Sequence, residues 1–84
     1  MWYLELNNVM TDINITDVSS AESILSDVEN VLDTEYPDYF PYGVYDVEVL
    51  DKAEKHIDIH LVIEDRHDDF NCGLTVAARI VFVN

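Results

Sequence analysis

Basic residues are scarce in this sequence, and the shortage excludes several classes of function. Only four lysines and arginines stand against eighteen aspartates and glutamates, which gives a formal net charge of −14 at pH 7. A surface of this charge repels DNA, RNA and anionic lipids, so we expect no direct binding to nucleic acid or to a membrane. The partners that such a surface favours are basic proteins.

Cysteine, glycine and long apolar runs are scarce as well. Cys72 is the single cysteine, which excludes an internal disulfide and fits a reducing compartment such as the cytoplasm. Only Gly43 and Gly73 are present, so no glycine-rich loop is available to hold phosphates. Residues 1–8 contain no basic residue and no long apolar run, so we expect no signal peptide. No stretch of the sequence is long and apolar enough to span a membrane.

Apolar residues, in contrast, are plentiful and periodic. They make up 49% of the 84 residues, enough for a small core. We therefore expect the chain to fold as one domain, 1–84, although this much charge drives apolar-poor chains toward disorder.

Residues 56–64 alternate with a period of two, the pattern of a strand with one buried face. We expect this segment to be the central strand of a sheet. Its apolar parity consists of Ile57, Ile59, Leu61 and Ile63, and its polar parity contains His56, Asp58, His60 and Glu64, with Val62 as the apolar exception.

Shorter alternating segments predict the other strands. Asn7 and Asn8 supply a tight turn between strands at 2–7 and 9–16, because asparagine tolerates positive φ; one long bulged strand is the alternative. Further strands are expected at 44–50 and 74–82. The side chains expected to face the core are Val9, Ile13 and Ile15, then Tyr45, Val47 and Val49, then Leu74, Val76, Ala78, Ile80 and Phe82.

One helix is expected between the second and third strands. Ser19 and Glu22 fit a capping box, in which each side chain bonds to the backbone amide of the other residue. Apolar residues then recur at helical spacing, and the helix should end near Asp33 or Thr34, ahead of Pro37. The fold class is therefore α+β: an antiparallel β-sheet, with the order β-β-α-β-β-β along the chain, packed on one α-helix.

Turn lengths suggest a register for the last three strands. Pairing Leu50 with His56 places Glu48 opposite Asp58, and pairing Ile63 with Leu74 places Asp58 opposite Arg79. A slip of two residues keeps the same parity, so that alternative stays open.

Residues 34–43 form a loop with four aromatic residues and two prolines. We expect the rings to cap one end of the core, since aromatic side chains bury a large area. The alternative is an interface loop, because tyrosine is enriched at protein–protein contacts.

No motif predicts catalysis, a metal or a cofactor. His56 and His60 lie about 13 Å apart on a straight strand, too far to share a zinc ion that sits about 2 Å from each ligand. The acidic loop with Asp65, His67 and Asp69 lacks the glycine and the terminal glutamate of an EF-hand. Nothing near Cys72 supplies the basic surroundings that activate a thiol. We therefore expect a protein that is not an enzyme.

The spacing of the acids gives the functional hypothesis. Phosphates follow one another about every 7 Å along a DNA strand. Alternate residues on a β-strand are about 6.6 Å apart, and i,i+4 neighbours on a helix about 6 Å. Asp46 and Glu48, or Glu29 and Asp33, therefore lie near phosphate spacing. The alternative is that the acidic surface only keeps the protein soluble.

In size, charge and lack of a catalytic motif, the chain resembles the small acidic inhibitors encoded by phages. These include DNA-mimicking anti-CRISPR proteins, anti-restriction proteins and uracil-DNA glycosylase inhibitors. The resemblance implies a stoichiometric inhibitor, active in the host cytoplasm, that blocks the basic DNA- or RNA-binding surface of an enzyme or complex. An immunity or antitoxin-type neutraliser, or an acidic accessory subunit, is the alternative function.

Two acidic surfaces are candidates for the partner site. The sheet patch is expected on the outer strand face and the adjoining turn, and consists of Asp46, Glu48, Asp58, Glu64, Asp65, Asp68 and Asp69. The helix patch consists of Glu22, Glu29, Asp33, Glu35 and Asp38, with Tyr39 as an aromatic anchor. Apolar residues such as Val62 and Val81 share the outer strand face, which suggests a partner or homodimer contact there.

Overall fold

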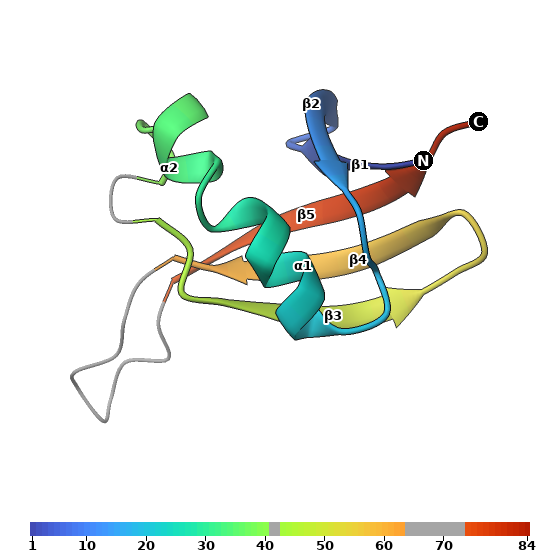
Figure 1. The fold of residues 1–84 in the computed structure, drawn as a ribbon. Helices are drawn as coiled ribbons and strands as arrows, with labels where there is room; N and C mark the ends of the chain where they lie inside the picture. The colour runs from blue at the N-terminus through green and yellow to red at the C-terminus, as the bar shows by residue number, and fades with distance from the viewer. Residues whose placement is uncertain (41–42, 64–73) are drawn as a thin grey trace.

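The computed structural model describes residues 1–40, 43–63 and 74–84. In these residues five strands form one antiparallel sheet, and two short helices lie on one of its faces (Figure 1). The α+β class is confirmed. The elements are β1 (Trp2–Leu6), β2 (Val9–Ile15), α1 (Ala21–Val28), α2 (Leu32–Glu35), β3 (Asp46–Lys52), β4 (His56–Val62) and β5 (Thr75–Phe82).

The strand order is β2-β1-β5-β4-β3, so the middle strand is β5. The sequence predicts a central strand at residues 56–64. β4 lies there as an interior strand, and its predicted alternation is confirmed, since Ile57, Ile59 and Leu61 are buried. The prediction is wrong in placing β4 at the centre. Both β4 and β5 carry buried positions, and alternation alone does not tell which of two interior strands is the middle one.

The hairpin of β1 and β2 has the tight turn that the sequence predicts. Asn7 and Asn8 adopt φ of 51° and 64°, and Leu6 pairs with Val9 across them. The register shifts further along, and Thr11 spans the irregularity: its Oγ1 donates to the Leu4 carbonyl at 2.6 Å and accepts from the Ile13 amide at 3.1 Å. Val9 is 65% exposed, contrary to the prediction, because it lies directly at the hairpin turn.

The helical region differs from the prediction at its start and in its continuity. Ser20, not Ser19, is the N-cap, since its Oγ accepts from the Ser23 amide at 3.2 Å. The Ser19 amide donates instead to Asp17 Oδ1 at 2.9 Å. The chain leaves α1 after Val28 and enters α2 at Leu32, because residues 29–31 include Asn30 and β-branched Val31, which have low helix propensity.

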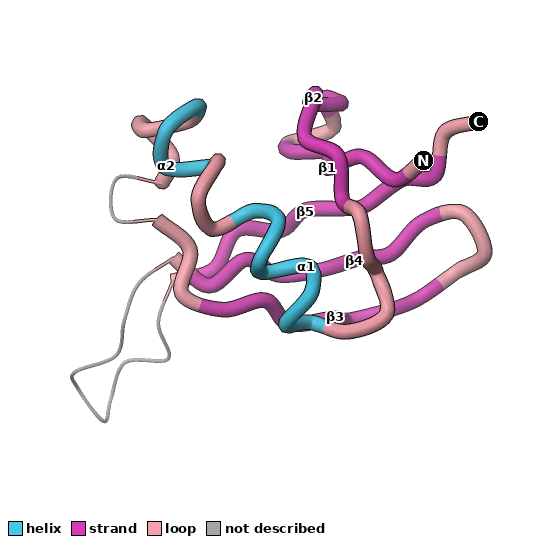
Figure 2. Tube along the Cα trace, viewed as in Figure 1, coloured by secondary structure: helices cyan, strands magenta, loops and turns pink. Residues whose placement is uncertain are grey.

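The helices lie over one face of the sheet (Figure 2), and buried side chains of the helices and the strands together form the core. The predicted helical stripe is confirmed, since Ile24, Val28 and Leu32 are fully buried across both helices. Each such side chain stabilises the fold by roughly 1.5–3 kcal/mol relative to an exposed position. Phe40 is also fully buried, so the prediction that the aromatic loop caps the core is confirmed for this ring.

Two tyrosines and several apolar residues are more exposed than predicted. Tyr39 is 63% exposed and Tyr45 is 48% exposed, so Tyr45 does not face the core. Leu74, which precedes β5, and Phe82, its last residue, are also exposed. Tyr42 lies outside the described residues.

The register of β3 and β4 corrects the predicted one by two residues. Glu48 lies opposite His60, not Asp58, and Val49 lies opposite Ile59. The turn is tighter than predicted, and the Ala53 amide closes it by donating to the His56 carbonyl at 2.8 Å. The register then shifts by one residue at Leu50. Asp51 therefore faces Asp58. The predicted pair of Asp58 with Arg79 is confirmed.

Candidate functional site

The two acidic patches lie on opposite faces of the protein. The helix patch is on the exposed side of α1 and α2 and on the segment that follows them, and all of its members are exposed. The described part of the sheet patch, Asp46, Glu48 and Asp58, belongs to the outer polar parity of β3 and β4. A single flat partner surface therefore contacts one patch at a time. The remaining predicted members of the sheet patch, Glu64, Asp65, Asp68 and Asp69, lie outside the described residues.

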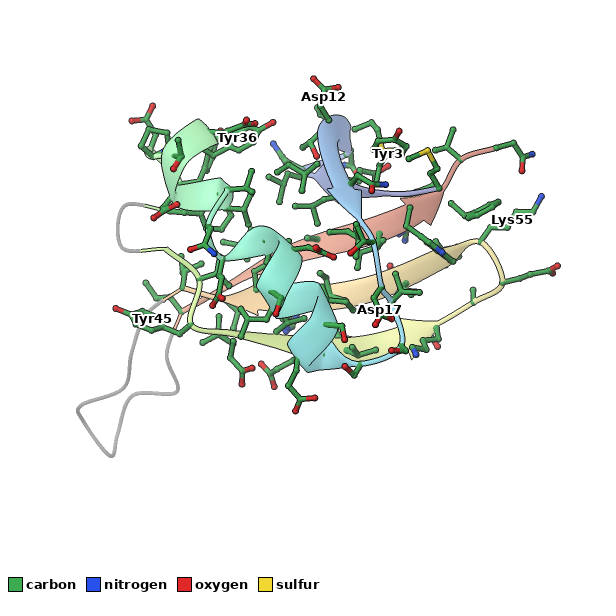
Figure 3. The ribbon with its side chains drawn as sticks, viewed as in Figure 1. Tyr3, Asp12, Asp17, Tyr36, Tyr45 and Lys55 are labelled. Atoms are coloured by element: carbon green, nitrogen blue, oxygen red, sulfur yellow. The ribbon has the colours of Figure 1, made fainter. Side chains whose placement is uncertain are left out.

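The helix patch has no cationic side chain near it in the sequence. Residues 1–51 contain twelve aspartates and glutamates and no lysine, arginine or histidine. The first basic residues, Lys52 and Lys55, lie at and after the end of β3, and Lys55 is at the end of the sheet away from α2 (Figure 3). The negative potential over the helices is therefore not neutralised by a neighbouring cation in the same half of the chain.

The position of one acid on α1 opposes the helix dipole. Glu22 lies in the first turn, where a negative charge is favourable, but Glu29 is the C-cap residue, where a negative charge is unfavourable. The last turn of α1 contains no basic residue. The sequence thus retains a charge here that costs about 0.3–1 kcal/mol of stability.

Two further acids near α1 hold the chain in place. Asp27 accepts from the Thr16 amide at 2.8 Å and from the Thr16 hydroxyl, which ties the end of β2 to the helix. Hydrogen bonds from the side chain and backbone of Ser19 lower the pKa of Asp17 below its ordinary value of 3.8. In the helix patch, the Asp33 carboxylate also has a partner, because its Oδ1 accepts from the Thr34 hydroxyl at 3.4 Å.

The sheet patch contains a cation at its centre. Arg79 Nε donates to Asp58 Oδ1 at 2.7 Å, and this hydrogen bond, with the charges of Asp58 and Glu5, raises the pKa of the Arg79 guanidinium. Register places these groups in one row across four strands: Asp51, Asp58, Arg79 and Glu5. Asp51 and Glu5 are unpredicted members of this row: Asp51 enters it through the irregularity at Leu50, and Glu5 through the pairing of β1 with β5, which are distant in sequence.

A pocket of about 530 Å³ lies beside the helix patch. Sequence reasoning did not predict it, although it singled out two of its aromatic residues. Tyr36, Tyr39 and Phe40 contribute its aromatic lining, and residues of the β1–β2 hairpin contribute much of the rest. The lining consists of Leu6, Asn7, Val9, Thr11, Tyr36, Tyr39, Phe40, Val76 and Ala77. A second, more open hollow of about 410 Å³ lies on the outer sheet face, beside Leu50, Asp58 and Arg79.

The described residues were also compared with the requirements for a metal site and for a membrane-spanning helix. Within residues 1–40, 43–63 and 74–84, no three histidine, cysteine, aspartate or glutamate side chains are grouped so that they could hold a metal ion. In the same part of the chain, neither helix has the length and apolar character needed to cross a membrane.

Comparison with known proteins finds no matching protein-family model, no matching curated protein and no matching solved structure. Function is therefore inferred from the charge and geometry of the chain itself.

Proposed function

We propose that this protein is a stoichiometric inhibitor that imitates nucleic acid and occupies the basic DNA- or RNA-binding surface of an enzyme or complex. The observation that carries the proposal is the helix patch. Its carboxylates are exposed, and no basic residue occurs in residues 1–51. A basic cleft that neutralises phosphates also neutralises such a surface, and binding releases the counterions of the acidic surface as it releases those of DNA.

The helix patch supports the proposal better than the sheet patch does. In the sheet patch Arg79 neutralises Asp58, and a partner's cation would have to compete with a bond of 2.7 Å. In the helix patch Glu29 follows α1 and Asp33 lies in α2, so the predicted spacing of i,i+4 neighbours on one helix does not apply to this pair. A set of several such acids presents separate negative charges, as successive phosphates do.

The stability cost of the acids also supports a binding role. A surface that only solubilises a protein needs net charge, but it does not need that charge at a helix C-terminus. Glu29 is nevertheless an acid at the C-cap of α1. A partner with a basic surface turns this unfavourable position into a favourable contact.

The test begins with a target captured from lysate by the immobilised protein and identified by mass spectrometry. A labelled DNA or RNA that binds this target is then titrated with the inhibitor. We expect the protein to displace the nucleic acid with a stoichiometric end point. We also expect salt to weaken the complex of target and inhibitor, because the interface depends on charge. If the target binds the protein and its nucleic acid together without loss of affinity, a neutraliser or accessory subunit replaces the proposed function.

Two matched variants identify the surface that acts. The helix variant carries Glu22→Gln, Glu29→Gln, Asp33→Asn, Glu35→Gln and Asp38→Asn. The control variant removes the same number of negative charges elsewhere, through Glu5→Gln, Asp46→Asn, Glu48→Gln, Asp51→Asn and Glu54→Gln. After circular dichroism shows that both variants fold, the helix variant should lose competition and the control should keep most of it. Normal inhibition by both variants would contradict phosphate mimicry.

A further inference from the structure

The pocket beside the helix patch adjoins a part of β5 that lacks a neighbour on one side. β4 pairs with β5 as far as Val62 and Thr75, but the ladder between β1 and β5 ends at Leu6 and Ala78. Beyond that point the chain turns away through Asn7 and Asn8 into β2. In the described part of the chain, no strand therefore continues β1 alongside residues 75–77.

The hydrogen-bonding pattern shows which backbone groups face this vacant position. Met1 and Val83 exchange two backbone hydrogen bonds of 2.7 Å. Hydrogen-bonded pairs alternate along an antiparallel ladder, so the odd-numbered residues of β5 direct their amides and carbonyls to the β1 side. Thr75 has this orientation and lies beyond the end of the β1 ladder. An added extended segment finds a donor and an acceptor there.

The walls of the pocket fit a side chain with an apolar stem and a positive end. Tyr36, Tyr39 and Phe40 supply aromatic surface, and Leu6 and Val9 supply aliphatic surface on the opposite side. Two exposed acids adjoin the tyrosines of the pocket wall in the chain, since Glu35 precedes Tyr36 and Asp38 precedes Tyr39. Aromatic faces attract guanidinium groups, and arginine covers apolar surface with its stem while its charged end reaches polar groups.

We propose that this pocket is the docking site for an extended, arginine-bearing segment of a basic partner protein. The segment lies near Thr75 along the edge of β5 that no described strand covers, and its arginine side chain enters between the tyrosines and the hairpin. The inference rests on the proposed function for the basic character of the partner, and it adds the site where one side chain is anchored. A second copy of the chain is a poor occupant, because two molecules of formal charge −14 repel each other.

The test uses synthetic peptides and the whole protein labelled with ¹⁵N. One peptide has the core Val-Arg-Val between glycines, and the matched peptide has citrulline, a neutral analogue of nearly the same shape, in place of arginine. The arginine peptide should shift the amide signals of Thr75, Val76 and Ala77 and those near Tyr36 and Tyr39, with saturation. The citrulline peptide should bind on the order of tenfold more weakly, because it lacks the charge.

Two exposed tyrosines provide a matched pair of variants. Tyr39→Ala removes a wall of the pocket, and Tyr45→Ala removes a tyrosine that is not part of its lining. We expect on the order of a tenfold loss of peptide affinity for the first variant and little change for the second. The inference is overturned by equal binding of both peptides, by equal affinity of both variants, or by shifts spread over the acidic surface without saturation at the pocket.

Failure of this inference is distinguishable from failure of the proposed function. If the captured target competes with its nucleic acid but the arginine peptide leaves the pocket signals unchanged, the docking site is wrong and the inhibitor function stands. If the peptide saturates the pocket but the target binds nucleic acid and inhibitor together, the docking site stands and the mimicry is wrong.

Discussion

Asp51 and Asp58 face each other across β3 and β4 on the outer face of the sheet, and Arg79 binds only the second of them, at 2.7 Å. Like charges directly opposite in a sheet are destabilising. The guanidinium reduces this repulsion through Asp58, and Glu5, which pairs with Arg79 on the other side, places a third carboxylate in the same row.

Replacing Asp51 with asparagine should stabilise the protein. The change removes the repulsion with Asp58, and we expect a gain of about 0.2–1 kcal/mol in the free energy of unfolding at low salt. Urea denaturation measures it, with Glu54→Gln in the adjacent turn as a control of equal charge. The difference between the two variants should shrink in high salt, because exposed charges are screened. An equal or larger gain from Glu54→Gln would contradict a specific repulsion between Asp51 and Asp58.

The pair of Arg79 and Asp58 should show favourable coupling in a double-mutant cycle. We expect Arg79→Gln to destabilise the protein, because it leaves Asp58 between two other carboxylates. In the double variant Arg79→Gln with Asp58→Asn, part of this loss should be recovered. Chemical denaturation of the four proteins gives the coupling energy, and a value of zero would contradict the ion pair.

Ser20→Ala should destabilise the protein by about 1 kcal/mol, because the Ser23 amide loses its acceptor at the start of α1. Ser19→Ala is the comparison, since the hydroxyl of Ser19 does not cap the helix, and its loss removes only a hydrogen bond to exposed Asp17, which should cost less. Thermal or urea denaturation distinguishes them. The opposite order of effects would support the capping box expected from the sequence and would contradict the observed cap.

Asp17 should contribute stability that disappears in acid. Its pKa is lower in the folded protein than its ordinary value of 3.8, so the folded state favours the charged form. This contribution is present above the unfolded pKa and is lost as the pH falls through the folded pKa. Asp17→Asn should therefore be less stable than Asp12→Asn, a control of equal charge change, at pH 7. The difference should begin to shrink as the pH falls to about 3.8, and the two variants should converge only below the lower pKa of folded Asp17. A constant difference across the range would contradict this assignment.

Periodic features were predictable from the sequence because their physical cause is local or repeats along the chain. The alternation at Ile57, Ile59 and Leu61 identifies a half-buried strand, and paired asparagines identify a turn with positive φ. The helical stripe through Ile24, Val28 and Leu32 was found for the same reason.

The features that the sequence did not predict depend on distant contacts or on small differences between neighbours. Ser19 and Ser20 are both good N-caps, and the choice between them follows from Asp17, which takes the Ser19 amide. The shift at Leu50 preserves the burial of Val47, so hydrophobic pattern alone could not decide it. The pocket required the spatial meeting of the β1–β2 hairpin with Tyr36 and Tyr39, which no local pattern encodes.

The position of β5 also determines the order in which the protein can assemble. The β1–β2 and β3–β4 hairpins join neighbouring segments and close short loops, whereas β5 must come between β1 and β4 after both have been synthesised. Contacts of such long sequence separation make folding slow, because the chain loses entropy before they form. In a ribosome-bound chain that has not released residues 75–82, the two hairpins are therefore not joined into one sheet. The helices then lack the continuous sheet face on which they pack in the complete fold.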